Sequence, residues 1–323
     1  MRPVTLATAR RFGFSVVDLG LLVTIVIWGV NYAAIKAALR ELDPYVFNAV
    51  RFVMATLTLA ALARGRGAMP RIPRHDLAKL ALLGILGNTL YQVIFIQGIA
   101  RTTAANASLI MSSCPMLVAL LATAIGRDRL PRLAWAGVAL AVGGLALVLA
   151  AGSHNEFKTG NLAGDLLILA SAAVWAAYTV FASGVMARTP AVTATLVTFV
   201  AGTPPLVLLA LPSLARQDWG AVGARGWFGV AFSGVFAIGV AYILWNAGIA
   251  TLGGARTAVY QNFTPVIAAG FAWLTLGERW TPGQFLGAAA VLSGIALTRS
   301  GGNAGTGAAK ADASAGNAPS GAA

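Results

Sequence analysis

Long apolar runs, each the length of a membrane-spanning helix, dominate this chain. They measure about 17–25 residues, and a helix of about 20 residues crosses the roughly 30 Å of hydrocarbon in a bilayer. None shows the strict polar–apolar alternation that a membrane β-barrel requires. We therefore expect an all-α membrane protein with ten transmembrane helices, at Val17–Leu39, Val46–Ala63, Leu77–Gly98, Thr103–Ile125, Leu133–Ala151, Leu162–Met186, Ala191–Leu211, Trp227–Ala247, Arg256–Leu276 and Pro282–Thr298.

Composition and charge agree with a membrane protein. The chain is 58% hydrophobic and 10% charged, with a mean hydropathy of +0.77, whereas soluble domains carry about 25% charged residues. The net charge of +13 could suggest a nucleic-acid partner, but the placement of the charges argues against one. With the N-terminus in the cytoplasm, fifteen Lys and Arg residues fall inside and six outside. This bias orients membrane proteins, so we expect both termini in the cytoplasm and no nucleic-acid partner.

The chain also repeats itself. From about residue 81 to residue 147 the sequence recurs without gaps at a shift of 150 residues, so that Pro115 returns as Pro265. Further upstream the shift is 147 residues, and Trp28 matches Trp175. A repeat of this length, made of apolar spans, predicts two homologous halves.

The halves are expected at residues 1–151 and 160–299, followed by a disordered cytoplasmic tail at 300–323. Each half holds five predicted spans, and an odd number forces the second half to enter from the opposite side. The turn at Asp128 then faces the cytoplasm and its counterpart at Glu278 faces outside. Proteins built from such inverted repeats commonly bind a ligand between the halves and rock one against the other. The repeat therefore favours a secondary transporter that works by alternating access.

Two other classes of protein compete with this interpretation. An intramembrane enzyme would need a catalytic constellation, but the chain has no His-Glu-x-x-His, no Gly-x-Ser-x-Gly and no aspartate pair within a span. We therefore expect no catalytic residue, no metal site and no cofactor. A non-transporting membrane scaffold or assembly subunit would not need polar residues in mid-membrane. Replacing Asn88 and Gln92 by leucine should leave such a scaffold working, whereas a transporter should lose flux while still folding.

Small residues recur in the third, fifth and tenth spans at near-helical spacing. Such residues let helix backbones approach closely in lipid. Glycine and alanine are abundant throughout the chain, but their paired occurrence in both halves favours helix packing at Gly84, Gly87, Gly137, Ala141, Gly144, Gly287 and Gly294.

Several short motifs resemble the EamA-type branch of the drug/metabolite transporter superfamily. They are Trp28-Gly29-Val30-Asn31, then Pro44 with Phe47 and Arg51, and the run from Pro115 through Asp128-Arg129-Leu130 to Gly137 and Gly144, repeated from Pro265 through Glu278-Arg279 to Gly287 and Gly294. The resemblance covers residues 15–299 and implies a ten-helix carrier of small metabolites, often an exporter, with a central cavity in a bacterial inner (plasma) membrane. The chain departs from the usual pattern at Asp128, where glutamate is common, and at Trp175-Ala176-Ala177-Tyr178.

Polar and aromatic residues deep in the spans are the candidates for substrate binding. Trp28 and Trp175 lie near mid-membrane, too deep for the aromatic belt at the headgroups, although core packing is the alternative. Amides at this depth need partners within the protein or in a water-filled space, so interhelical hydrogen bonding and a cavity wall both remain open. The full candidate set is Trp28, Asn31, Asn88, Tyr91, Gln92, Ser108, Ser112, Trp175, Tyr178, Tyr260 and Gln261.

Pro115 and Pro265 occupy equivalent depths in the fourth and ninth spans. Proline removes a helical hydrogen bond and kinks a span, so the pair could act as gates, or the kinks could be purely architectural. Tyr242, Trp245 and Asn246 form one face of the eighth span near its predicted cytoplasmic end. That depth favours an aromatic-belt role over substrate contact.

Charged residues near or within the spans bear on the substrate. Arg51 could attract an anionic or carboxylate-bearing solute, or it could snorkel to the surface and pair with Glu41 or Asp43. All ten acidic residues lie at span ends, in loops or in the tail, and neither histidine lies in mid-membrane. No proton or cation carrier is therefore evident within a span. We expect a neutral or zwitterionic metabolite, such as an amino acid or a related compound, moved down its gradient or by exchange.

Overall fold

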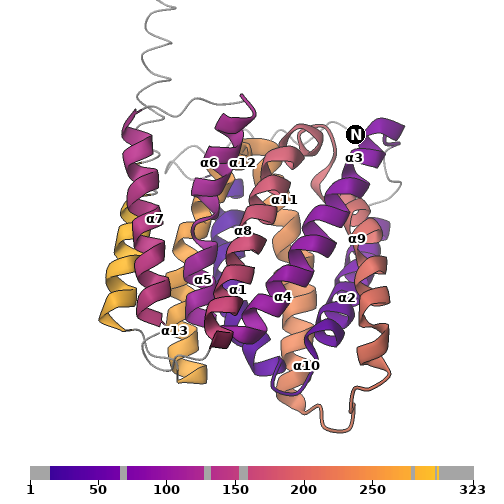
Figure 1. Cartoon of the computed structure of the whole chain (residues 1–323). Helices are drawn as coiled ribbons and strands as arrows, with labels where there is room; N and C mark the ends of the chain where they lie inside the picture. The colour runs from indigo at the N-terminus through magenta and orange to yellow at the C-terminus, as the bar shows by residue number, and fades with distance from the viewer. Residues whose placement is uncertain are drawn as a thin grey trace, which may run out of the picture.

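The structure is a computed structural model that describes residues 15–65, 71–126, 132–152, 159–277, 281–294 and 297. Every regular element in these ranges is helical, and the helices stand side by side in one bundle (Figure 1). The predicted all-α class is confirmed. The turns at Asp128 and Glu278 and the tail at 300–323 lie outside the described residues, so the predictions made for them stay predictions.

The helices follow the predicted apolar runs closely. Residues 282–294 are helical and correspond to the tenth run. The other elements are α1 Val16–Ala38, α2 Pro44–Gly65, α3 Arg74–Gly84, η1 Ile85–Leu90, α4 Tyr91–Arg101, α5 Ala104–Met111, α6 Cys114–Ala124, α7 Arg132–Gly152, α8 Thr159–Met186, α9 Ala191–Leu214, α10 Ala224–Ala231, η3 Phe232–Val240, α11 Ala241–Leu252, α12 Gly254–Ala258, η4 Val259–Phe263 and α13 Thr264–Leu276.

Seven helices in the described ranges are long and apolar enough to cross a membrane, and a shorter apolar helix covers Trp135–Leu147. The chain is thus a multi-pass membrane protein. Several spans extend beyond their predicted bounds, and the largest extensions are at Arg74–Arg101 and Ala224–Leu252, each of which forms one continuous helical unit. The count of ten spans and the inverted relation of the halves remain predictions.

Wide π-helical turns interrupt the third span of each half. They occupy η1 and η3, and the 150-residue shift places the first within the second. Such turns take up an extra residue within a helix and are frequent at functional sites. Gln92 lies just after η1, and Tyr242 lies just after η3.

The fourth and ninth spans are broken rather than kinked within a helix. Ser112 and Ser113 form a turn between α5 and α6, and the 3₁₀ segment η4 separates α12 from α13. Pro115 is the second residue of α6, and Pro265 is the second residue of α13. Proline is well tolerated in a first helical turn, where its missing N–H would have no helical partner. Each proline therefore begins a new helix.

Close helix contacts occur at equivalent glycines in reciprocal pairs. A Cβ on Gly144 would lie 2.7 Å from the carbonyl oxygen of Gly287, and one on Gly294 would lie 2.5 Å from that of Gly137. A second reciprocal pair has the same geometry. A Cβ on Gly84 would lie against the carbonyl oxygen of Thr198, and one on Gly234 would lie against the carbonyl oxygen of Arg51. The predicted close packing is present, because no side chain larger than hydrogen fits at these backbones.

Substituting valine for Gly144 should lower the free energy of unfolding by about 1–3 kcal/mol, since overpacking forces backbone shifts. Gly143 is a matched control on the same helix, because nothing lies within 4 Å of a Cβ built there. Thermal unfolding of the purified variants in detergent compares the two. Equal melting temperatures for Gly144→Val and Gly143→Val would contradict the close approach of α7 and residues 282–294.

Side chains at corresponding positions also meet each other. Phe52 stacks on Phe199 with ring centroids 5.3 Å apart, and the hydroxyls of Thr56 and Thr203 are hydrogen bonded at 2.8 Å. Both pairs are separated by 147 residues. Contacts between a residue and its own counterpart are what a two-fold relation between two units produces. In Figure 1, the chain descends from α3 to α4 but ascends from α10 to α11, so these corresponding segments run in opposite directions.

Candidate functional site

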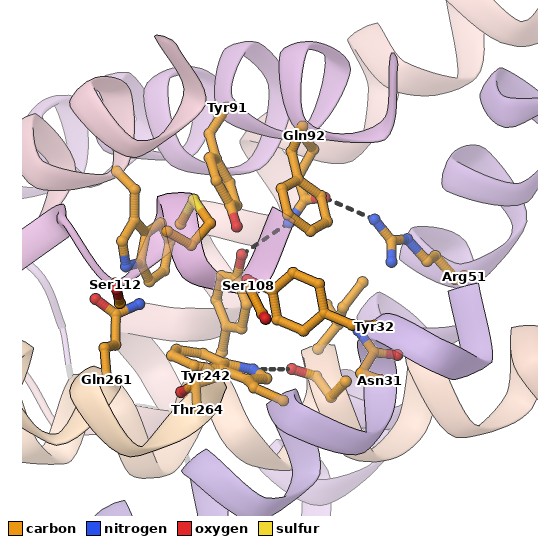
Figure 2. A pocket seen from close by; sticks show the side chains of 16 residues that line it. Asn31, Tyr32, Arg51, Tyr91, Gln92, Ser108, Ser112, Tyr242, Gln261 and Thr264 are labelled. Atoms are coloured by element: carbon orange, nitrogen blue, oxygen red, sulfur yellow. Dashed lines mark hydrogen bonds between the residues drawn. The ribbon is translucent and has the colours of Figure 1, made fainter. Parts of the chain in front are cut away.

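A cavity lies at the centre of the bundle, and both halves of the chain line it (Figure 2). The volume of this cavity that the centre of a water molecule can occupy is about 40 Å³, and one water needs about 10–15 Å³. The cavity therefore has room for a few waters and is too small to hold an amino acid. Its walls are formed by Trp28, Asn31, Tyr32, Arg51, Tyr91, Gln92, Phe95, Ser108, Met111, Ser112, Trp175, Ala237, Ile238, Tyr242, Gln261 and Thr264.

Aromatic rings from both halves form the middle of the cavity wall. Trp28 on α1 and Trp175 on α8 meet edge to face at 5.9 Å, and each also contacts Tyr242, at 6.1 and 5.4 Å. Trp28 donates its indole N–H to the carbonyl oxygen of Ala237 at 2.8 Å, which fixes the ring against η3. The ring centroids of Tyr91 and Trp175 lie 4.9 Å apart. The tryptophans thus pack against other rings and line the cavity at the same time.

Arg51 supplies the positive charge of the cavity. It is 1% exposed and lies two turns into α2. The guanidinium donates to Asn48 Oδ1 at 2.8 and 3.0 Å, to Ser233 Oγ at 2.8 Å and to Gln92 Oε1 at 2.7 Å. Phe47 packs under it, with 4.9 Å from Cζ to the ring centroid. These partners are neutral, so the site keeps a net positive charge.

The surface-snorkelling interpretation of Arg51 is wrong. Glu41 instead accepts hydrogen bonds from the backbone N–H groups of Gly223 at 2.9 Å and Gly226 at 3.1 Å, at the start of α10. Asp43 Oδ1 accepts from the backbone of Tyr45 at 2.8 Å, at the start of α2. Both carboxylates serve helix N-termini, where the backbone dipoles favour a negative charge.

Gln92 joins the two halves through the charged centre. Its side-chain oxygen accepts from Arg51, and its side-chain nitrogen donates to the hydroxyl of Tyr242 at 2.9 Å. Gln92 and Tyr242 correspond under the 150-residue shift. Interhelical bonding and cavity lining, which the sequence left as alternatives, thus apply together.

The other end of the cavity offers hydrogen-bond acceptors. Ser108 and Ser112 donate their hydroxyl hydrogens to the carbonyl oxygens of Ala105 and Leu109, at 2.8 and 2.6 Å. Their oxygens therefore remain available as acceptors. Gln261 Oε1 is buried and has no hydrogen-bond partner. Thr264 Oγ1 also belongs to a cavity-lining residue and is buried without a partner, and the same is true of Asn31 Oδ1 elsewhere in the wall.

The structure brings eight of the eleven predicted substrate-binding residues to the cavity and leaves three outside its wall. Asn88 is fully buried, and neither its amide nitrogen nor its amide oxygen has a partner. Tyr178 packs behind the wall, stacks on Trp175 at 4.9 Å and donates to Asn246 Oδ1 at 2.9 Å. Tyr260 donates to Asp18 Oδ1 at 2.5 Å.

The two prolines also lie outside the cavity wall. Pro115 is buried, and Pro265 faces an apolar groove between α13 and residues 282–294. Each is close in sequence to a cavity-lining residue, because Ser112 precedes Pro115 and Thr264 precedes Pro265.

Sequence reasoning missed several wall residues, of which Tyr242 matters most. The predicted eighth span ended at Ala247, so Tyr242 and Trp245 were assigned to the aromatic belt. That interpretation is wrong, because the helix continues to Leu252 and both residues are at most 3% exposed. The repeat held the missing signal, since Tyr242 corresponds to the predicted site residue Gln92. The other residues missed are Met111, Ala237, Ile238 and Thr264.

Several proteins with similar sequences carry names that describe transporters. A transporter of Archaeoglobus fulgidus described as uncharacterized is 28% identical over 86% of this chain and 95% of its own length. A "probable terminal-alkyne amino-acid exporter" of Streptantibioticus cattleyicolor is 27% identical over 86% of this chain and 91% of its own. A "probable amino-acid metabolite efflux pump" of Salmonella typhimurium is 24% identical over 89% and 94%.

A solved crystal structure shares the fold. It aligns with a TM-score of 0.63 at 21% sequence identity and covers 87% of this chain and 95% of the other. The EamA-like transporter family matches the chain twice, over residues 15–150 and 162–300. These matches confirm the expected resemblance and the expectation of a transporter rather than an enzyme. The central cavity thus lies in a membrane transport protein, and the chain belongs to the EamA-like transporter family.

Proposed function

We propose that the protein is a secondary transporter that exports a small neutral or zwitterionic metabolite, an amino acid or a related compound. It works by alternating access, in which two inverted five-helix repeats rock about the central cavity. The observation that carries this proposal is a narrow, polar and aromatic cavity in mid-bundle whose wall is shared by both halves.

The inverted arrangement is supported by the reciprocal contacts. Gly144 and Gly294 make equivalent contacts with the opposite backbone, and Gly98 and Gly248 lie against the side chains of the corresponding residues Ile168 and Leu21. The two matches of the family to consecutive segments agree with two repeats. With five spans in each, an odd number, the second repeat enters the membrane from the opposite side.

Alternating access is supported by the size of the cavity. In this conformation it admits only a few water molecules, so a solute must enter through movement of its walls. Arg51, Asn48 and Gln92 come from the first half, while Ser233 and Tyr242 come from the second. Relative motion of the halves would therefore open and reshape the site. The broken helices before Pro115 and Pro265 are the proposed gates.

The substrate assignment rests on the charge of the site and on the relatives. Arg51 would attract a carboxylate by charge-assisted hydrogen bonds. Within the described residues, no Asp, Glu or His belongs to the cavity wall, which favours exchange or downhill movement over proton coupling. Two relatives carry names that refer to amino-acid or metabolite export. Location in the inner (plasma) membrane with cytoplasmic termini completes the proposal.

Transport by purified protein in liposomes tests the function. An amino-acid panel should show counterflow of at least one solute with no imposed pH or sodium gradient, at a rate several times that of empty liposomes. Nucleosides, sugars and cationic dyes serve as comparison solutes. A strict requirement for either ion gradient would contradict exchange or downhill movement.

The inverted repeats are tested by measuring whether the loops at Asp128 and Glu278 lie on opposite faces of the membrane. Cysteines introduced at Asp128 and Glu278 should react with a membrane-impermeant maleimide from opposite faces, with Glu278→Cys labelled in intact cells and Asp128→Cys only after permeabilisation. Cys114 is fully buried and so provides little background. Labelling of both introduced cysteines from the same face of the membrane would contradict the inverted arrangement.

A further inference from the structure

We propose that the cavity, once movement of its walls has widened it, holds its ligand in one orientation, with a carboxylate at Arg51, an aromatic body against the ring wall, and a hydrogen-bond donor at its far end facing Gln261. The inference rests on the proposed function and names a substrate class for the same cavity. That class is a small aromatic carboxylate, including an amino acid, with a distal hydroxyl or amine.

Arg51 defines the anionic end of the ligand. A guanidinium has N–H donors and no acceptor, and here its protein partners are the neutral oxygens of Asn48, Gln92 and Ser233. No acidic side chain belongs to the described cavity wall. A cation buried deep in a membrane protein is costly unless a negative charge compensates it. A ligand carboxylate supplies that charge in a geometry that matches the planar guanidinium.

Gln261 defines the opposite end. Figure 2 draws Gln261 and Ser112 on the far side of the cavity from Arg51. Gln261 is 6% exposed, and its side-chain oxygen has no partner. The hydroxyl of Ser112 donates to Leu109, which leaves its oxygen as an acceptor. Buried acceptors without donors are destabilising, so a donor on the ligand is the group that this end lacks.

The wall between these ends suits a flat ring. Tyr242 is drawn between Arg51 and Gln261 in Figure 2, and its ring contacts those of Trp28 and Trp175. Aromatic rings prefer edge-to-face or offset contacts with other rings, and such contacts already occur throughout this wall.

The amino group of an amino acid would also find a partner near Arg51. Asn31 Oδ1 belongs to a cavity-lining residue, is buried and has no hydrogen-bond partner. Figure 2 draws Asn31 on the same side of the view as Arg51. A carboxylate and an ammonium group on one carbon would thus meet a donor and an acceptor at one end of the cavity.

Three probes that differ by single groups test this orientation on the purified full-length protein. L-Tyrosine carries both end groups, L-phenylalanine lacks the distal hydroxyl, and tyramine lacks the carboxylate. Dissociation constants from melting-temperature titrations should rank tyrosine about tenfold tighter than phenylalanine and at least about tenfold tighter than tyramine. Liposome counterflow should follow the same order.

Variants assign each preference to one end. Gln261→Leu should bring tyrosine and phenylalanine to within about twofold while tyramine stays weak. Arg51→Gln should remove most of the preference for tyrosine over tyramine. Asn262→Leu is the matched control, because the neighbouring Asn262 also has a buried oxygen without a partner but does not belong to the cavity wall. It should keep both preferences.

The outcomes separate this inference from the proposed function. Equal binding of tyrosine and phenylalanine, or a preference that survives Gln261→Leu, overturns the inference. It is also overturned, while the proposed function stands, if the protein ignores all three probes and transports another metabolite. If folded protein transports no solute, both are overturned.

Discussion

Arg51→Gln should reduce transport at least about a hundredfold while the protein still folds. A paired, charge-assisted contact with a carboxylate contributes about 3 kcal/mol or more, and each 1.4 kcal/mol corresponds to a tenfold change in affinity. Folding should suffer little, because burial of the cation is itself costly and glutamine keeps donors for the oxygens of Asn48 and Gln92. Initial rates of solute counterflow in liposomes measure the first effect, and thermal unfolding in detergent measures the second.

Arg101→Gln makes the same chemical change outside the cavity. Arg101 ends α4, is exposed and bonds to Gln97 one turn earlier. We expect its transport rate to stay within about twofold of the unmodified protein, since surface interactions of this kind contribute little. The carboxylate role of Arg51 is refuted if Arg51→Gln and Arg101→Gln transport equally well.

Gln92→Leu should lower transport at least about tenfold, the second-largest effect expected. The substitution removes the bridge between Arg51 and Tyr242 and leaves a guanidinium N–H and a tyrosine hydroxyl without their partner. Each such loss in a buried site costs about 1–3 kcal/mol. Because the bridge spans the two halves, its loss should disturb both the site and the contact that rearranges during transport. Counterflow rate and melting temperature are the two readings.

Asn88→Leu provides the comparison one turn earlier on the same span. Asn88 is fully buried, and its side-chain amide has no partner in the described structure. Replacing such a group with an apolar side chain of similar size should raise the free energy of unfolding by about 1–3 kcal/mol. Transport should fall less than in Gln92→Leu. A scaffold with no transport role would show no flux to lose in either variant, and equal flux in all three proteins would contradict the role of Gln92.

The helices and much of the cavity wall could be predicted because both depend on local patterns. A run such as Val46–Ala63 must be helical in a bilayer to satisfy its own backbone, and the structure has a helix at Pro44–Gly65. Amides and aromatic residues within such runs stand out against the apolar background. Gln92 and Trp175 were identified in this way, and both line the cavity.

Residues whose roles depend on distant partners were harder to place. Asn88 and Gln92 look alike in the sequence and lie one turn apart, but Asn88 packs against Gly202 of α9. Gln92 reaches the cavity, and Asn88 is buried outside its wall. Arg51 likewise bonds to Ser233, which lies 182 residues away in the other half. Neither outcome is contained in the local spacing of residues.

The amino-acid sequence by itself determined that this is a helical membrane protein with a repeated unit, because hydrophobic length and internal repetition are properties of the chain. Only the tertiary structure decided which polar side chains share the central cavity and that Arg51 is buried among neutral partners. Those facts depend on how the two halves pack, and packing joins residues that no sequence window contains together.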